Sequence, residues 1–170
     1  MRDPQSFDEF YRGSALRTLR YAVAIVRDRA EAQDAVQEAY TRAWQRWETL
    51  ASHPYPEAWV RLTVTRLATD RWRRLTGLWA AIARTDRSTG IAAPPSENTV
   101  LLVTALRQLP ARQRQVLALH YLVDLTVDEI AAEVGIASGT VKSLLSRGRD
   151  RLAAQLGDLA PDRPLEVHDA

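Results

Sequence analysis

Apolar residues recur every three or four positions along most of this 170-residue chain, which is the period of an amphipathic α-helix. No segment shows the strict alternation of apolar and polar residues that is typical of a half-buried strand. The pattern predicts helices over residues 5–26, 29–48, 57–75, 97–108, 111–122, 126–134 and 138–156. We therefore expect an all-α protein.

Capping residues support several of these helix starts. Asp28 with Glu31, and Thr126 with Glu129, have the spacing at which a side chain accepts a hydrogen bond from the first helical turn. Pro110 also suits a helix start, because its missing N–H is not needed there. These local signals place three helix N-termini independently of the apolar pattern.

A change in composition divides the chain into two parts. Residues 76–97 combine glycine, serine and threonine with a Pro-Pro pair, so we expect a linker with at most a short helical turn near 78–84. The linker separates a domain at 5–75 from a domain at 98–156, and residues 157–170 are expected to form a disordered tail. The sequence thus predicts two small helical domains joined by a linker, the second with four helices.

The second predicted helix has one apolar stripe. Its members fall four, three and four positions apart, and they are Val36, Tyr40, Ala43 and Trp47. This spacing places them on one side of a helix, so we expect the stripe to be buried. The segment 51–58 that follows contains two prolines and is predicted to be a loop.

The last two predicted helices have the spacing of a helix-turn-helix, the motif that places its second helix in the major groove of DNA. The motif needs inward apolar residues, a turn glycine and a serine that caps the second helix, and here these are Ile130, Val134, Gly135, Ser138, Val141 and Leu145. Ala131 is small where the two helices cross. An ordinary helical hairpin in a bundle is the alternative, and the coincidence of all these positions favours the DNA-binding motif.

A polar face of the last helix is left for DNA once Val141 and Leu145 face inward. Lysine and arginine donate to guanine edges or phosphates, and serine donates to either. The residues expected to meet DNA are Ser138, Gly139, Thr140, Lys142, Ser143, Ser146 and Arg147. Gly139 would let backbone N–H groups approach a phosphate, although glycine is also simply tolerated at a helix start.

A second group of arginines lies in the predicted helix at 57–75, although the net charge is only +2. Its outward face is expected to hold Arg61, Arg66, Asp70, Arg73 and Arg74. A phosphate backbone would neutralise the unpaired charge; pairs four residues apart, such as Arg66 with Asp70, are the alternative. Trp59 and Trp72 could stack on unpaired bases, but packing inside the domain is the commoner role.

Composition narrows the function classes. The chain has no cysteine, which excludes disulfides, thiolate metal sites and a cysteine nucleophile. Its three histidines lack the spacing of metal ligands, and we expect no metal, no cofactor and no enzymatic activity, because no convergent acid, base or nucleophile is visible. No apolar run is long enough to cross a membrane, and the N-terminus lacks the apolar core of a signal peptide. The expected location is the cytoplasm.

Two parts of the chain resemble a known family. Residues 105–152 closely resemble the C-terminal domain of bacterial sigma factors of the extracytoplasmic-function (ECF) type, and residues 27–47 and 58–74 resemble the N-terminal domain of that family. The matches have the order of the family and cover most of 7–156. The resemblance implies two helical domains that bind core RNA polymerase and direct it to promoters. The N-terminal domain would recognise and melt the minus-ten element, and the C-terminal domain would recognise the minus-thirty-five element.

The resemblance also implies roles for particular residues. The helix at 29–48 would dock on the coiled-coil clamp helices of the largest polymerase subunit, through Asp34, Gln37 and Glu38. From the residues alone, a solvated acidic face near a helix N-terminus would be the preferred interpretation. An unpaired base would be held at the loop that contains His53, Pro54, Tyr55 and Pro56. The expected minus-ten residues are His53, Tyr55, Trp59, Arg61, Arg66, Asp70, Arg73 and Arg74.

Two positions depart from the pattern of the family. Arg66 stands where asparagine is common, four residues before Asp70, and arginine offers hydrogen-bond donors only, so the minus-ten preference is open. Leu144 stands where the family often has arginine. Leucine cannot bind phosphate, so either one DNA contact is missing or this turn packs against protein.

The predicted partners are core RNA polymerase, promoter DNA and, by resemblance, an anti-sigma factor. The free chain is expected to be a monomer. A rival interpretation is a free-standing helix-turn-helix regulator with a helical sensor or dimerisation domain, which would bind a palindromic site as a dimer without polymerase. The promoters and the inducing signal cannot be read from the sequence.

Overall fold

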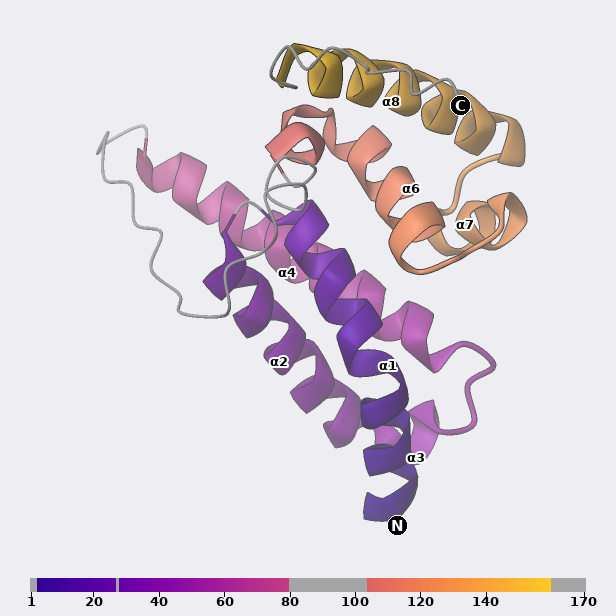
Figure 1. Cartoon of the computed structure of the whole chain (residues 1–170). Coiled ribbons are helices and arrows are strands. Elements are labelled where there is room, and N and C mark those ends of the chain that lie inside the picture. The colour runs from indigo at the N-terminus through magenta and orange to yellow at the C-terminus, as the bar shows by residue number, and fades with distance from the viewer. Residues whose placement is uncertain (1–2, 27, 80–103, 160–170) are drawn as a thin grey trace, which may run out of the picture.

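The computed structural model describes residues 3–26, 28–79 and 104–159, and gives the backbone alone at 71–79 and 158–159. The helices run in the order α1 (Pro4–Ile25), α2 (Arg29–Gln45), α3 (Trp47–Leu50), α4 (Pro56–Trp79), α6 (Ala111–Leu122), α7 (Val127–Val134) and α8 (Ser138–Leu159), and residues 104–108 are also helical (Figure 1). These described residues contain no strand, so the prediction of an all-α protein is confirmed. Most of the predicted linker, the start of the helix predicted at 97–108 and most of the predicted tail lie outside the described residues.

Helices α1 to α4 form the N-terminal domain around one apolar core (Figure 1). The predicted stripe is buried in full, because all four side chains are at most 8% exposed: Val36, Tyr40, Ala43 and Trp47. The Tyr40 hydroxyl lies 2.7 Å from the Ser14 hydroxyl and 3.1 Å from the Thr18 hydroxyl. The polar atom of the stripe is therefore hydrogen-bonded inside the core, as buried polar atoms generally are.

Two helix boundaries in this domain differ from the prediction. The helix predicted at 29–48 is divided at Arg46, which has φ −110° and ψ 10° and whose N–H donates to the carbonyls of Arg42 and Ala43. The short α3 still keeps Trp47 in the core, so the apolar spacing alone could not show the break. Helix α4 continues past the predicted end at residue 75 to Trp79, because a threonine and a glycine weaken a helix without ending it.

The predicted N-terminal caps of α2 and α7 are confirmed. Asp28 Oδ1 accepts a hydrogen bond from the N–H of Glu31 at 2.9 Å. Thr126 and Glu129 form a reciprocal capping box, in which the Thr126 N–H donates to Glu129 Oε2 at 2.8 Å. Hydrogen bonds from the backbone and hydroxyl of Thr126 lower the pKa of Glu129. The start of the helix-turn-helix is therefore fixed by interactions within four residues.

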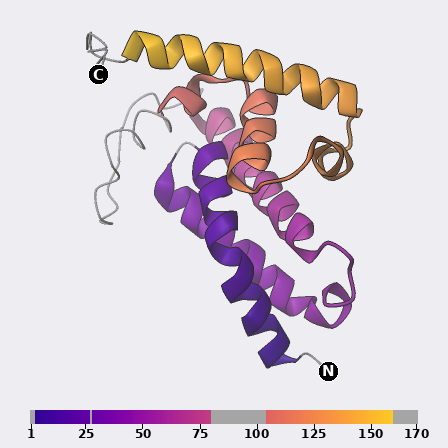
Figure 2. The same ribbon diagram turned by 45° about the vertical axis from the view of Figure 1, so that its right-hand side comes forward.

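The C-terminal domain comprises the described residues from 104 onward. Helices α6, α7 and α8 enclose a core that includes Leu117, Ile130 and Val141, each at most 1% exposed. Helix α8 crosses α6 closely at Gly148, where an added Cβ atom would lie 2.8 Å from Leu117 Cδ1. Figure 2 shows α8 lying across the end of α6. Glycine at this crossing allows the close approach of the two helices.

The two domains lie against each other (Figures 1 and 2). Tyr21 and Ala24 of α1 are 1% and 2% exposed and belong to the apolar cluster of the C-terminal domain. The Tyr21 hydroxyl lies 2.8 Å from Thr65 Oγ1 in α4, and Gln115 Nε2 in α6 donates to it at 3.4 Å. The sequence indicated two domains but no contact between them, because this contact joins segments far apart in the chain.

Candidate nucleic-acid interface

Helices α7 and α8 form the predicted helix-turn-helix. Gly135 ends α7 in the left-handed conformation, with φ 72° and ψ 40°, and its N–H donates to the Ala131 carbonyl at 2.9 Å. Glycine takes this conformation at little steric cost. Ile130, Val141 and Leu145 are 0%, 0% and 3% exposed, so the two helices are held together by the apolar residues expected from the sequence.

The expected DNA-binding face of α8 points to solvent. Five of its seven members are exposed and two are half-buried; in chain order the seven are Ser138, Gly139, Thr140, Lys142, Ser143, Ser146 and Arg147. Arg147 Nη2 donates to Ser143 Oγ one turn earlier, so these two groups lie on one side of the helix. Within the described residues Lys142 forms no ion pair, and its charge is available to a ligand.

The cap predicted for α8 is wrong. Ser138 is the first residue of α8 rather than the residue before it, and its hydroxyl donates to Asp128 Oδ1 of α7 at 2.7 Å. A carboxylate is a stronger acceptor than a neutral group, so the hydroxyl turns toward α7. The serine thus joins the two helices of the motif.

Leu144 faces the protein interior. Its side chain is half-buried and packs against the apolar cluster of the C-terminal domain, beside Leu145. Of the two explanations left open by the sequence, the structure supports packing against protein. The leucine therefore adds to the core at a position where the family often has arginine.

The outward orientation predicted for Arg61 is wrong in this structure. The Arg61 side chain is 5% exposed, and its Nε and Nη2 atoms donate to the two carboxylate oxygens of Glu133 in α7 at 2.9 and 2.7 Å. Nη1 donates to Glu57 at 3.3 Å. Burial would lower the pKa of Arg61, but the hydrogen bond and charge of Glu133 raise it, so the guanidinium remains charged. Glu133 lies 72 residues away in the other domain, and helical periodicity cannot reveal such a partner.

The other residues predicted to bind the minus-ten element differ in their exposure to solvent. Arg66 and Asp70 are exposed on α4, as expected. Trp59 is half-buried against the N-terminal core, and the guanidinium of Arg46 lies 5.9 Å from its ring centroid. These contacts favour the packing interpretation of Trp59. The side chains of three further candidates, Trp72, Arg73 and Arg74, lie outside the described residues.

The loop before α4 is exposed and borders a cavity between the domains. His53 Nδ1 accepts a hydrogen bond from the Tyr55 N–H at 3.0 Å, and the Tyr55 side chain is 67% exposed. The cavity has a volume of about 410 Å³ and is lined by Phe10, Arg17, Pro54, Tyr55, Pro56, Glu57, Ala58, Arg61, Val123, Asp124 and Leu125. The predicted base-holding loop therefore faces the connection between α6 and α7.

The proposed polymerase contacts on α2 share one exposed face. Asp34, Gln37 and Glu38 are all exposed, and Glu38 Oε1 accepts a hydrogen bond from Arg42 Nε at 2.7 Å. Helical spacing of three and four residues puts the three side chains on the same side of α2. The structure thus brings these residues together, as the sequence predicts.

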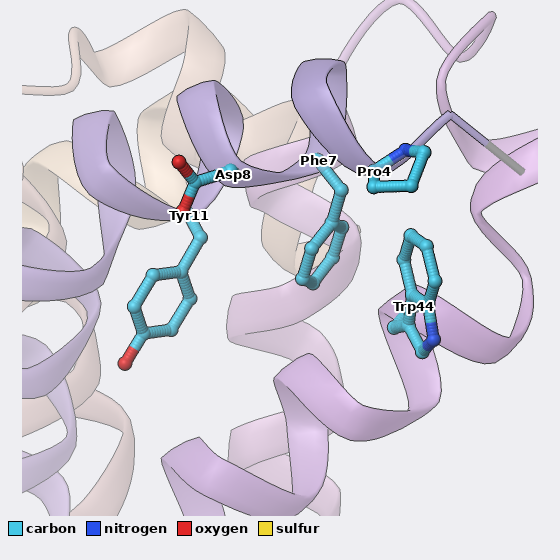
Figure 3. Close-up of a pocket in the computed structure, with 5 residues that line it drawn as sticks. All are labelled: Pro4, Phe7, Asp8, Tyr11 and Trp44. Atoms are coloured by element: carbon cyan, nitrogen blue, oxygen red, sulfur yellow. The ribbon is translucent and has the colours of Figure 1, made fainter.

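An apolar groove that the sequence did not reveal lies between α1 and the end of α2. It has a volume of about 450 Å³ and is lined by Pro4, Phe7, Asp8, Tyr11 and Trp44 (Figure 3). The Phe7 and Trp44 ring centroids are 5.1 Å apart, and Tyr11 is 44% exposed. Trp44 falls outside the buried stripe of α2, and an aromatic residue in that position was the signal that could have indicated the groove.

Among the described residues, no group of three or more histidine or acidic side chains is placed to hold a metal ion. In the same described part of the chain, no helix has the length and apolarity needed to span a membrane. The exposed Lys142 and Arg147 lie on a helix anchored by the buried Val141 and Leu145, and this cationic face suits the binding of a polyanion.

These features define a DNA-binding protein with two helical domains, and the comparisons agree with that class. The family described as Sigma-70 region 2 matches residues 10–77, and the one described as Sigma-70, region 4 matches residues 99–152. The chain is 31% identical over 151 residues to the RNA polymerase sigma-E factor of Streptomyces avermitilis, which covers 88% of this chain and 84% of that protein. It is 32% identical over 150 residues to the ECF RNA polymerase sigma factor SigL of Mycobacterium tuberculosis, with 85% of each chain covered.

A solved structure has the same fold. The sigma factor RpoE of Bartonella quintana, crystallised in complex with the anti-sigma factor NepR, matches with a TM-score of 0.76 and 24% identity, over 92% of this chain and 98% of that chain. The chain belongs to the extracytoplasmic-function (ECF) family of RNA polymerase sigma factors. As a member of this non-enzymatic family it directs promoter-specific transcription initiation, which confirms the function expected from the resemblance.

Proposed function

We propose that the exposed face of α8 recognises the minus-thirty-five element while the N-terminal domain recognises the minus-ten element. The observation that carries this proposal is the exposure of Lys142, Ser146 and Arg147 above the buried Val141 and Leu145. In a helix-turn-helix, the first turns of the second helix reach base edges in the major groove. These three side chains lie in the first three turns of α8, where they can donate to guanine edges and phosphates.

At the minus-ten element, the exposed loop and the exposed part of α4 share the recognition. Tyr55 stacks on an unpaired base in this proposal, because an exposed aromatic ring is the usual platform for single-stranded DNA. Arg66 holds a backbone phosphate, since a guanidinium has donors only. His53 shapes the loop through its hydrogen bond from the Tyr55 N–H. Asp70, Arg73 and Arg74 lie further along α4 and continue the proposed minus-ten face.

The partner for the exposed face of α2 is core RNA polymerase. Asp34, Gln37 and Glu38 together present carboxylate and amide groups to solvent, and these suit polar and cationic side chains on a protein partner. The free chain acts as a monomer in the cytoplasm until it joins the polymerase. An inhibitory partner is also part of this proposal, since the fold is shared with a sigma factor that was crystallised with an anti-sigma factor.

Run-off transcription with purified core polymerase, with and without this chain, tests the proposal. Transcripts from discrete start sites on genomic templates should appear only when the chain is present. The same chain should co-purify with core polymerase. A chain that binds a palindromic site as a dimer, and gives no transcript with polymerase, would support the free-standing regulator instead.

The matched control is a triple variant, Asp34→Ala with Gln37→Ala and Glu38→Ala. All three positions are exposed, so the fold should be unchanged. This variant should lose co-purification with core polymerase and the specific transcript, while its affinity for minus-thirty-five duplex DNA should stay within about twofold. Equal loss of DNA binding would mean that the α2 face was assigned to the wrong partner.

A further inference from the structure

Two serines on the DNA-binding face of α8 are hydrogen-bonded to side chains of opposite charge. The Ser138 hydroxyl donates to Asp128 Oδ1 of α7 at 2.7 Å. Ser143 Oγ accepts a hydrogen bond from Arg147 Nη2, which lies one turn further along α8. Both serines are half-buried, and both charged partners are exposed. The two hydroxyl groups therefore face DNA with different partners already in place.

The direction of each hydrogen bond follows from the charged partner. An ionised carboxylate has lone pairs but no proton, so Ser138 must donate its proton to Asp128. A guanidinium has protons but no lone pair to offer, so Ser143 must accept from Arg147. Hydrogen bonds to charged groups are about twice as strong as those between neutral groups, so each bond fixes the rotation of its hydroxyl.

The two serines consequently keep different hydrogen-bonding groups for DNA. A hydroxyl has one proton and two lone pairs. The proton of Ser138 is used by Asp128, so toward DNA this residue is an acceptor without a donor. Ser143 keeps its proton and can still donate as well as accept. A serine that can do both distinguishes bases poorly, because it finds a partner on either member of a base pair.

Ser138 is placed where base edges are expected. It is the first residue of α8, and the N-terminal residues of the second helix of this motif contact base edges in the major groove. The hydrogen-bond donors in that groove are the amino groups of adenine N6 and cytosine N4. Guanine and thymine present acceptors at the corresponding edge, and an acceptor-only serine cannot pair with them.

Asp128 is available to hold the Ser138 proton because a neighbouring residue caps the helix. Glu129 accepts from the Thr126 N–H and forms the reciprocal capping box of α7. Asp128 lies in the first turn of the same helix, where the helix dipole favours a negative charge. Within the described residues it forms no ion pair, so no cation competes with Ser138 for its carboxylate.

We propose that Asp128 is a positioning residue that sets the base preference of the recognition helix, because it makes Ser138 an acceptor for an adenine or cytosine amino group. This inference rests on the proposed function, since it assumes that the exposed face of α8 recognises base edges. Asp128 acts through Ser138 and needs no DNA contact of its own.

A purely structural role for the same hydrogen bond predicts a different result. The two helices are also joined by Ile130, Val141 and Leu145, which are at most 3% exposed, so the motif should stay folded without this bond. If the bond only oriented α8, its loss would weaken binding to all sequences by a similar factor. A change of base preference at one position distinguishes the two roles.

Base analogues that lack one amino group test the proposal on the full chain. The duplex carries the minus-thirty-five element located by run-off transcription, or otherwise the sequence that the chain selects from a random duplex pool. Each adenine is replaced in turn by unsubstituted purine, and each cytosine by 2-pyrimidinone, neither of which has the exocyclic amino group. At one position this change should weaken wild-type binding by about three- to tenfold, the effect of one hydrogen bond.

Two variants should remove this amino-group effect for different reasons. Ser138→Ala leaves no side-chain group to contact the base. Asp128→Asn has a side-chain amide that donates as well as accepts, so the Ser138 proton becomes available for DNA. In both variants the effect should fall below about twofold. Asp128→Asn should also bind a duplex with guanine or thymine at that position about three- to tenfold better, relative to its own best sequence, than the wild type does. Circular dichroism and thermal unfolding confirm that both variants are folded.

Two controls separate this effect from charge and from serine content. Asp150→Asn removes another exposed carboxylate of α8, and it should strengthen binding to every duplex by a similar factor without changing the amino-group effect. Ser143→Ala removes the serine that keeps its proton, and the amino-group effect should again be unchanged. The proposal is overturned if the wild type shows no amino-group effect, or if the effect persists in Ser138→Ala or in Asp128→Asn.

The two proposals can fail separately. If promoter-specific transcripts form but no amino-group effect depends on Ser138, the role of Asp128 is wrong and the proposed function stands. If no promoter-specific transcript forms, the proposed function is wrong, and the duplex selected from the random pool still tests Asp128. A chain that also selects no sequence from that pool would overturn both.

Discussion

Helices α4 and α8 have similar lengths, 24 and 22 residues, and both carry several arginines, but their surroundings differ. Along α8, Lys142 and Arg147 face solvent on one side of the helix. Along α4, Arg66 is exposed while Arg61 is buried against a carboxylate of the other domain. A cationic helix face is thus a DNA ligand or a structural contact according to what lies opposite it, and charge alone does not decide.

The difference follows from how each helix is positioned. The recognition helix is held by near neighbours in the chain, through the Gly135 turn and the Ser138–Asp128 hydrogen bond. On α4, the orientation of Arg61 is determined by Glu133, which lies 72 residues away in the sequence. Near neighbours fix the α8 face within its own domain, whereas the burial of Arg61 depends on the contact between the two domains. The exposure of the α8 face is therefore set within one domain, and the burial of Arg61 on α4 is set by the other domain.

The largest effect should come from removing the cations of α8. Lys142→Ala with Arg147→Ala deletes two donors to guanine edges or phosphates, and we expect affinity for minus-thirty-five duplex DNA to fall by about 2–4 kcal/mol, roughly 30- to 1,000-fold. The salt dependence of binding should weaken by about two units of slope if both contacts are to phosphates. Fluorescence anisotropy across a salt series measures both quantities.

Co-purification with core polymerase should be unchanged in that double variant, because the α2 face is on a different domain. Arg12→Ala serves as the matched control, since it removes an exposed arginine far from α8. If the double variant loses polymerase binding instead of DNA binding, the face of α8 was assigned to the wrong partner and the contrast with α4 disappears.

A smaller effect is expected at Arg66 of α4. Arg66→Ala should weaken binding of single-stranded minus-ten DNA by about 1 kcal/mol, roughly fivefold, and by the same factor for different base sequences, because a phosphate contact carries no base information. Arg66→Asn introduces an acceptor beside the donor and should create a preference among bases. The affinities of the wild type and of both variants for a panel of single-stranded oligonucleotides that differ in base sequence test these two expectations. A base preference that is strong in the wild type and absent in Arg66→Ala would show direct readout by the arginine.

Most of the fold could be predicted because it depends on local patterns. Helix α6 at Ala111–Leu122 coincides with the prediction, and the caps of α2 and α7 were correct, since each rests on residues close in the chain. The break at Arg46 was missed because Trp47 is buried whether the helix is continuous or divided. The docking of the domains was missed because no periodicity relates α1 to α6.

The candidate sites also include features that follow from local sequence patterns and features that depend on tertiary contacts. Apolar anchors in α8 indicated correctly which side of that helix faces solvent, because a helix with a buried stripe has only one free side, although Ser138 and Ser143 are half-buried. The sequence could not distinguish Arg61 from Arg66, since both lie off the apolar stripe of α4 and only the position of Glu133 separates them. The groove beside Trp44 depends on how α1 crosses α2, which is a tertiary property.

A footprint of the holoenzyme on its promoter tests most directly the claim that each domain reads its own element. With the wild-type chain, hydroxyl-radical protection should cover two patches about 25 base pairs apart, roughly 85 Å along the DNA. With Lys142→Ala and Arg147→Ala, the upstream patch should be lost while the downstream patch remains at saturating polymerase. Loss of the downstream patch alone, or a single continuous patch short enough for the docked domains, would contradict the account.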